Sequence, residues 1–177
     1  MDWPSYPPIV GQGIIISTMN QHGFGQMLDG ANTLSGTWNT SNRAVYMPVR
    51  ISEPVLARKL FWFNGATVSG NADCGIYDAA GTKIVSAGST AQSGTNALQE
   101  VDIADTLLDA GLFYMGLALD NTTGTFFRLS VGTAYRAQAM GTVMQATAFP
   151  LPAAATFAAY TDTVTAYVCG FSGRVVI

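Results

Sequence analysis

The sequence predicts an all-β protein, a jelly-roll or Greek-key β-sandwich with an extended, irregular N-terminal arm. Three observations lead to this prediction. Apolar residues recur with a period of two in eight to nine short segments, which is typical of strands. Gly, Asn and Thr turns separate these segments at intervals of roughly 8–12 residues. Some connections are long, which favours a jelly roll or Greek key over a simple meander.

The composition favours the same class. Charged residues make up 11% of the 177-residue chain, and the formal net charge is -3, whereas roughly 25% of residues are charged in ordinary soluble domains. A nucleic-acid-binding protein needs Lys and Arg to neutralise phosphates, and long exposed helices need Glu, Lys and Arg. The sequence therefore argues against both, and the low charge suits a protein that packs against other subunits.

Residues 1–43 form the first of two predicted regions. This segment is rich in Pro and Gly and almost without charge, so we expect it to be irregular and extended. It also carries large apolar side chains, which are not expected in a free, solvent-exposed tail. Either it packs over its own domain, or it docks as an arm on a neighbouring subunit. The expected anchors of the arm are Trp3, Tyr6, Pro7, Pro8 and Ile9.

Residues 44–177 form the predicted sandwich. In residues 44–51 every second side chain is apolar and lies on one face. In residues 55–64 both faces are largely apolar, and strict alternation places Arg58 on the same face as Leu60 and Trp62. A strand of this kind must be covered on both sides, by a second sheet or by a partner.

The following segments continue the strand pattern up to a long excursion. Residues 78–81 (Asp-Ala-Ala-Gly) predict a tight hairpin turn with Gly where a positive φ is needed. Residues 104–111 predict a single helical turn ended by Gly. Residues 134–160 break the rhythm and predict a long excursion with one short helix between Ala134 and Met140.

Candidate catalytic groups are few. His22 is the only histidine, so any Ser-His-Asp or Cys-His mechanism would have to use it. A glycosidase needs two carboxylates across a cleft, but an exposed strand edge and a turn cap explain the acidic residues better: Glu100, Asp102, Asp105 and Asp109. The sequence therefore predicts no catalytic residue and a protein that is not an enzyme.

Metal and cofactor sites are not predicted. Zinc needs a cluster of Cys and His, and Cys74, Cys169 and His22 are far apart in the sequence. We favour two buried free thiols over a long-range disulfide. Oxygen donors beside turns could hold calcium, although Asn and Asp also favour turns for conformational reasons; these donors are Asn71, Asp73, Asp120 and Asn121.

Candidate binding residues are arginines and aromatics. Arg58 and Arg128 lie within otherwise apolar strands, so we predict that they occupy an interface or form buried ion pairs. Trp38 and Tyr77 could belong to a sugar-stacking platform, although aromatic residues of a sandwich more often form its core. No segment approaches the ~18 apolar residues of a membrane span, so no membrane partner is expected.

The segment from residue 43 to residue 128 resembles a family of tailed-bacteriophage virion proteins with a jelly-roll fold like that of carbohydrate-binding modules. A Trp-containing strand leads into an Asn-Gly turn (Trp62 to Gly65). A Gly-Ile-Tyr-Asp strand follows (Gly75 to Asp78), and then an Asp-x-x-Leu-x-x-Gly turn precedes a Tyr-containing strand (Asp105 to Tyr114). These motifs concern the fold, and no catalytic residue comes with them.

The resemblance implies a virion structural protein that is assembled in the host cytoplasm. Members of the family include capsid decoration (cement) proteins and tail or fibre components. Because the sequence has no coiled-coil or β-helical stalk, a decoration protein that stabilises the capsid lattice is favoured. Its implied partners are the major capsid protein and copies of itself, as a trimer or dimer. The alternative is a tail- or fibre-associated module, or one that binds a host surface glycan.

Overall fold

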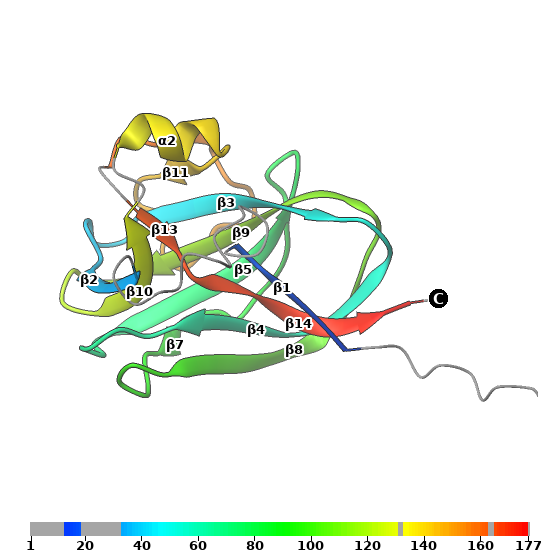
Figure 1. Ribbon diagram of the computed structural model, residues 1–177, viewed down its shortest axis with the longest axis horizontal. Coiled ribbons are helices and arrows are strands. Elements are labelled where there is room, and N and C mark those ends of the chain that lie inside the picture. Colours follow the sequence, from blue (N-terminus) through cyan, green and yellow to red (C-terminus); the bar gives the residue numbers. More distant parts are fainter. Residues whose placement is uncertain (1–12, 19–32, 131–132, 163–164, 177) are drawn as a thin grey trace, which may run out of the picture.

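Two antiparallel sheets face each other across an apolar core in the computed structural model, which describes residues 13–18, 33–130, 133–162 and 165–176 (Figure 1). The four-stranded sheet has the order β1 (Gly13–Ser17), β14 (Cys169–Val175), β4 (Val55–Phe63), β8 (Leu98–Leu108). The larger sheet has the order β12 (Ala158–Ala159), β11 (Val143–Gln145), β3 (Ala44–Ile51), β9 (Gly111–Leu119), β5 (Asn71–Asp78), β6 (Lys83–Ser86), and β7 (Thr90–Ala91) also pairs with β5.

The strand order confirms the predicted jelly roll. Eight strands in chain order are β1, β3, β4, β5, β6, β8, β9 and β14, and numbering them one to eight gives sheet orders 1-8-3-6 and 2-7-4-5. The chain therefore passes from one sheet to the other at most connections, as it does when two Greek keys form a jelly roll. The strands β11 and β12 extend the second sheet beyond β3.

A three-stranded sheet continues the four-stranded sheet at one end. It has the order β13 (Thr165–Tyr167), β10 (Thr125–Ser130), β2 (Thr33–Thr37). A bridge between Asn64 and Phe126 joins it to the end of β4. The predicted short helix is confirmed as α2 (Ala134–Ala139), which lies at the β3 side of the molecule, far from β4 and β8 (Figure 1).

The core follows the predicted alternation in most strands. Side chains at every second position of β3 and β9 lie between the sheets, where they meet alternate side chains of β4 and β5. The main contributors from these four strands are Val45, Met47, Val49, Leu60, Trp62, Cys74, Ile76, Met115 and Leu117. A second, smaller cluster lies on the outer face of the larger sheet, where residues 148–157 cover it.

The predicted boundary between an arm and a sandwich at residue 43 is wrong. Within residues 1–43, β1 pairs with β14 and β2 pairs with β10, and Trp38 is buried in the core. These segments belong to the sandwich because β1 covers one edge of β14 and buries Ile16. The proposed anchors Trp3, Tyr6, Pro7, Pro8 and Ile9 lie outside the described residues.

Two local predictions about β4 and β8 are also wrong. Residues 104–108 are not a helical turn, because Thr106, Leu107 and Leu108 pair with Ala57, Leu56 and Val55 and so continue β8. In β4 the register shifts on both sides at Arg58. Arg58 is the extra residue in the pairing with β14, whereas in the pairing with β8 it lies opposite the unpaired residues 103–105. This bulge puts Arg58 on the face of Lys59, opposite Leu60 and Trp62.

Candidate partner-binding face

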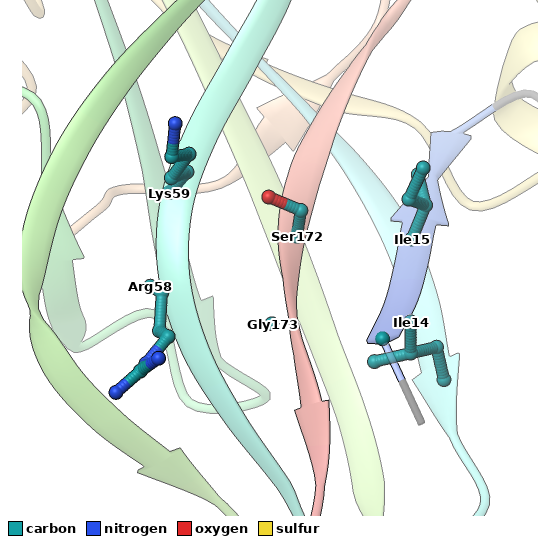
Figure 2. A pocket seen from close by; sticks show the side chains of 7 residues that line it. Ile14, Ile15, Arg58, Lys59, Ser172 and Gly173 are labelled. Atoms are coloured by element: carbon teal, nitrogen blue, oxygen red, sulfur yellow. The ribbon is translucent and has the colours of Figure 1, made fainter. Parts of the chain in front are cut away.

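A shallow groove of about 370 Å³ crosses the outer face of the four-stranded sheet. Its floor is β14, at Ser172 and Gly173, and β1 and β4 flank it. Figure 2 shows the isoleucine side chains of β1 on one side of β14 and the basic side chains of β4 on the other. The lining residues are Gly13, Ile14, Ile15, Arg58, Lys59, Ser172 and Gly173.

The groove floor has no side chain at Gly173, because the backbone of β4 lies too close to it. A Cβ atom added to Gly173 would lie 2.1 Å from the carbonyl oxygen of Leu56 on the neighbouring strand. No side chain is possible there unless β4 moves, because real Cβ contacts are never that short. The β-bulge next to it turns Arg58 and Lys59 out to the same side, and these two form one wall.

The charges on this face are largely balanced within the sheet. The Arg58 guanidinium lies 3.0 Å from the Asp105 carboxylate. The Lys59 ammonium lies 3.5 Å from Glu100 and 3.6 Å from Asp102. Arg58 therefore does form an ion pair, but the pair is about half exposed rather than buried. Such surface pairs contribute about 1 kcal/mol or less, so the groove wall offers packing surface more than free charge.

The apolar wall of the groove is exposed. Ile15 is 63% exposed, although it lies in the middle of a regular strand. Among the described strands, β1 is an end strand of its sheet, and it contains neither a charged residue nor a proline. Proteins usually protect edge strands with charges, prolines or bulges. The opposite end strand, β8, carries such protection in Glu100, Asp102 and Asp105.

Arg128 lies elsewhere, so the structure does not bring the two predicted arginines together. It belongs to β10 of the three-stranded sheet. Its side chain crosses Gly36, where an added Cβ would lie 1.9 Å from Nε, and Nη1 donates to the Thr37 carbonyl oxygen at 3.4 Å. Arg128 therefore covers backbone of its own chain, and an interface role for it stays a prediction.

The predicted sugar platform is wrong for both of its residues. Trp38 is 1% exposed and packs against Phe126 and Tyr167, with ring centroids 5.4 Å and 4.5 Å away. Tyr77 is fully buried, and its hydroxyl donates a hydrogen bond of 2.6 Å to the Pro152 carbonyl oxygen. Neither ring can stack on a sugar, because residues of the same chain cover both.

The Asn-Gly motif that carries the family resemblance is structural. Asn64 is fully buried, and its side-chain oxygen accepts hydrogen bonds from Trp62 Nε1 and Gln92 Nε2 at 2.9 and 3.1 Å. Its amide nitrogen donates to Ser93 O and Gln99 Oε1 at 2.6 and 2.9 Å. One side chain thus joins the end of β4 to the loop before β8, which explains why the turn needs Asn.

The buried acidic residue Asp73 also serves the fold. It lies on the outer face of β5 under residues 148–157, and Oδ2 accepts a hydrogen bond from the Leu151 backbone N–H at 3.0 Å. Burial raises the pKa of its carboxyl group above the ordinary value. Burial likewise raises the pKa of the nearby Tyr46 to about 12. The hydrogen bond from Leu151 therefore anchors the covering segment at Asp73.

Two of the calcium donors proposed from the sequence take part in hydrogen bonds of their own turn. Asp120 and Asn121 hydrogen bond to each other, and Asn121 accepts from two turn N–H groups. Within the described ranges, no three His, Cys, Asp or Glu side chains gather closely enough to hold a metal ion. No helix in these ranges is long and apolar enough to cross a bilayer. His22 lies outside them.

Fold and groove together define a jelly-roll protein with an exposed, nearly uncharged sheet edge. Comparison with protein-family models, with curated proteins and with solved structures gives no match. Sequence reasoning missed the groove. The run of three isoleucines at positions 14–16 was its only visible sign, because the glycine floor and the bulged Arg58 depend on how the strands pair.

Proposed function

We propose that this chain is a structural protein of a tailed-bacteriophage particle that decorates the capsid and stabilises its lattice. The observation that carries the proposal is the exposed β1 edge and groove on the outer face of the four-stranded sheet. The resemblance of residues 43–128 to virion proteins supports it independently, and so does the low overall charge.

The mechanism is burial of apolar surface at many equivalent contacts. Ile15 is exposed on a rigid strand, so a partner can cover it with little loss of conformational freedom. Full burial of one such side chain contributes about 1.5–3 kcal/mol. A single contact of this size is weak, but a decoration protein repeats it over the whole capsid and so raises the free energy needed to separate capsid subunits.

The position of β1 links this face to the preceding residues. Residues 1–12 join the sheet directly at Gly13, which lines the groove. This segment contains two aromatic residues and three prolines. We assign residues 1–12, rather than 1–43, to the proposed arm that reaches a neighbouring subunit.

A matched pair of substitutions tests the proposal. Ile15→Asp places a charge in the groove, whereas Ile84→Asp places it on β6 of the other sheet, at a residue that is 40% exposed. Each purified variant is added to particles that lack the protein, and bound protein is quantified against capsid protein. We expect Ile15→Asp to lower occupancy at least about tenfold, which corresponds to ~1.4 kcal/mol, and Ile84→Asp to bind like the wild type.

The control is that both variants fold as the wild type does, measured by circular dichroism and thermal unfolding. Equal occupancy of the two variants would overturn the assignment of this face. The copy number of the wild-type protein tests the decoration role itself. A fixed, lattice-like ratio to capsid protein supports it, and a few copies per particle would place the protein in the tail or fibres instead.

A further inference from the structure

The two cysteines lie on opposite sheets of the sandwich. Cys74 belongs to β5 in the larger sheet, and Cys169 is the first residue of β14 in the four-stranded sheet. Both are fully buried in the same apolar cluster, and both are free thiols. No covalent bond joins the two sheets in the described residues, so non-covalent contacts hold the sandwich together.

The strand register brings the two thiols to the same place. Cys169 lies opposite Trp62 on β4, and Gly170 lies opposite Phe61. The Cys74 sulfur crosses the core to within 3.8 Å of the Phe61 carbonyl oxygen, one residue from the position opposite Cys169. Both side chains therefore lie in the same part of the core, beside the end of β4.

The strand that carries Cys74 approaches the strand next to Cys169 across the core. Some Cα atoms of β4 and β5 lie within 8 Å of each other, although the strands belong to different sheets. Disulfides join residues whose Cα atoms are roughly 4.4–6.8 Å apart. A disulfide between Cys74 and Cys169 requires their Cα atoms to come within this range.

We propose that Cys74 and Cys169 are the site of a disulfide that joins the two sheets when the chain meets an oxidised low-molecular-weight disulfide such as oxidised glutathione. One cysteine thiolate attacks the glutathione disulfide, forms a mixed disulfide and releases one glutathione thiolate. The second cysteine thiolate then attacks the protein sulfur and releases the other. Two electrons pass to glutathione, and the two cysteine protons end on its two thiols.

The surroundings decide when the bond forms. The hydrogen bond with Cys169 and burial raise the pKa of the Cys74 thiol well above its ordinary value, so the reactive thiolate is scarce in the folded protein. Reaction therefore takes place during folding or local opening. Once formed, the bond is shielded from reductants by the same core. Oxidation thus converts the fold from a dithiol form to a form whose two sheets are joined by a disulfide. This inference does not depend on the proposed virion role.

The test compares the same thiol–disulfide equilibrium in the folded and unfolded chain. The wild-type protein is equilibrated with reduced and oxidised glutathione, once during refolding in native buffer and once in concentrated urea. Acid quenching, alkylation of free thiols and intact-mass measurement then give the fraction of bridged monomer. We expect the bridge to be favoured on the order of 100-fold more in native buffer.

Two controls make the result specific. Cys74→Ser and Cys169→Ser must each retain one alkylatable thiol and form no bridged monomer. A non-reducing gel must show that the bridge lies within one chain. An equal or smaller bridged fraction in native buffer than in urea, or bridges only between chains, would overturn the proposal. The experiment measures the fraction of bridged monomer and uses no phage particle. Its result therefore tests the disulfide independently of capsid binding.

Discussion

Asp73 of β5 accepts a hydrogen bond of 3.0 Å from the backbone N–H of Leu151, and this bond ties the larger sheet to the segment that covers it. The Leu151 carbonyl oxygen accepts a second bond, of 2.7 Å, from Lys83 Nζ on β6. The N–H and the carbonyl oxygen of Leu151 are thus bonded to an acidic residue of β5 and a basic residue of β6, respectively. The part of the excursion that covers the sheet, residues 148–157, is therefore held in place although its sequence has little strand pattern.

Asp73→Asn should change how stability depends on pH. Burial raises the pKa of the folded Asp73 above its unfolded value, so its stabilising contribution is complete below the unfolded pKa and is lost as pH rises through the folded pKa. Asn keeps an oxygen for the Leu151 N–H and never ionises. We expect the variant to gain stability relative to wild type between pH 4 and pH 7, measured by urea unfolding. A stability difference that is constant over this range would contradict the assignment.

Asn64→Ala should destabilise the fold strongly. The substitution leaves the buried Trp62 indole N–H and Gln92 amide without their acceptor, and each buried group without a partner costs about 1–3 kcal/mol. We expect a loss of about 2–4 kcal/mol in the free energy of unfolding, measured by chemical denaturation. Asn39→Ala, at an exposed position, is the control and should change it by less than about 0.5 kcal/mol.

Gly173→Ala should damage the sheet that forms the groove, whereas Gly13→Ala should not. The new Cβ would meet the Leu56 carbonyl oxygen at 2.1 Å in the first case. In the second, the nearest atom is 4.0 Å away. Overpacking of this kind costs roughly 1–3 kcal/mol. Thermal unfolding of the two variants side by side checks the difference, and equal stability would show that β4 yields without cost.

The Arg58–Asp105 pair should contribute little to stability. Both side chains are about half exposed, so a double-mutant cycle with Arg58→Met and Asp105→Asn should give a coupling of about 0.2–1 kcal/mol that decreases with added salt. If Arg58→Met lowers the free energy of particle binding by more than it lowers the free energy of unfolding, Arg58 belongs to the interface. A coupling well above this range would mean that the pair is shielded from water.

Truncation distinguishes the arm from the sandwich. Removal of residues 2–12 should leave a folded domain, because β1 begins at Gly13. Removal of residues 2–18 also deletes β1, uncovers the edge of β14 and exposes the core around Ile16. We expect only the second variant to lose several degrees of thermal stability. If the shorter deletion binds particles at full occupancy, residues 1–12 have no role in binding.

Most strands could be predicted because their side chains alternate between core and surface. The segments of β3, β5 and β9 show this pattern, and the hairpin turn at Gly81 has the expected positive φ of 88°. The buried free thiols were also predicted correctly. Residues 104–108 could not be assigned in this way, because Asp105 and Gly111 favour a turn locally while pairing with β4 stabilises the strand.

The sequence by itself determined the fold class, since alternation and frequent turn residues suit two packed sheets and the scarcity of Lys and Glu disfavours long exposed helices. Tertiary structure alone decided which faces those strands present. The bulge at Arg58 depends on the registers of β14 and β8, and a shift of one residue moves a side chain to the opposite face. Burial of Trp38 and Tyr77 depends likewise on segments distant in sequence that cover them. The groove therefore arises from pairing between strands, which no local pattern encodes.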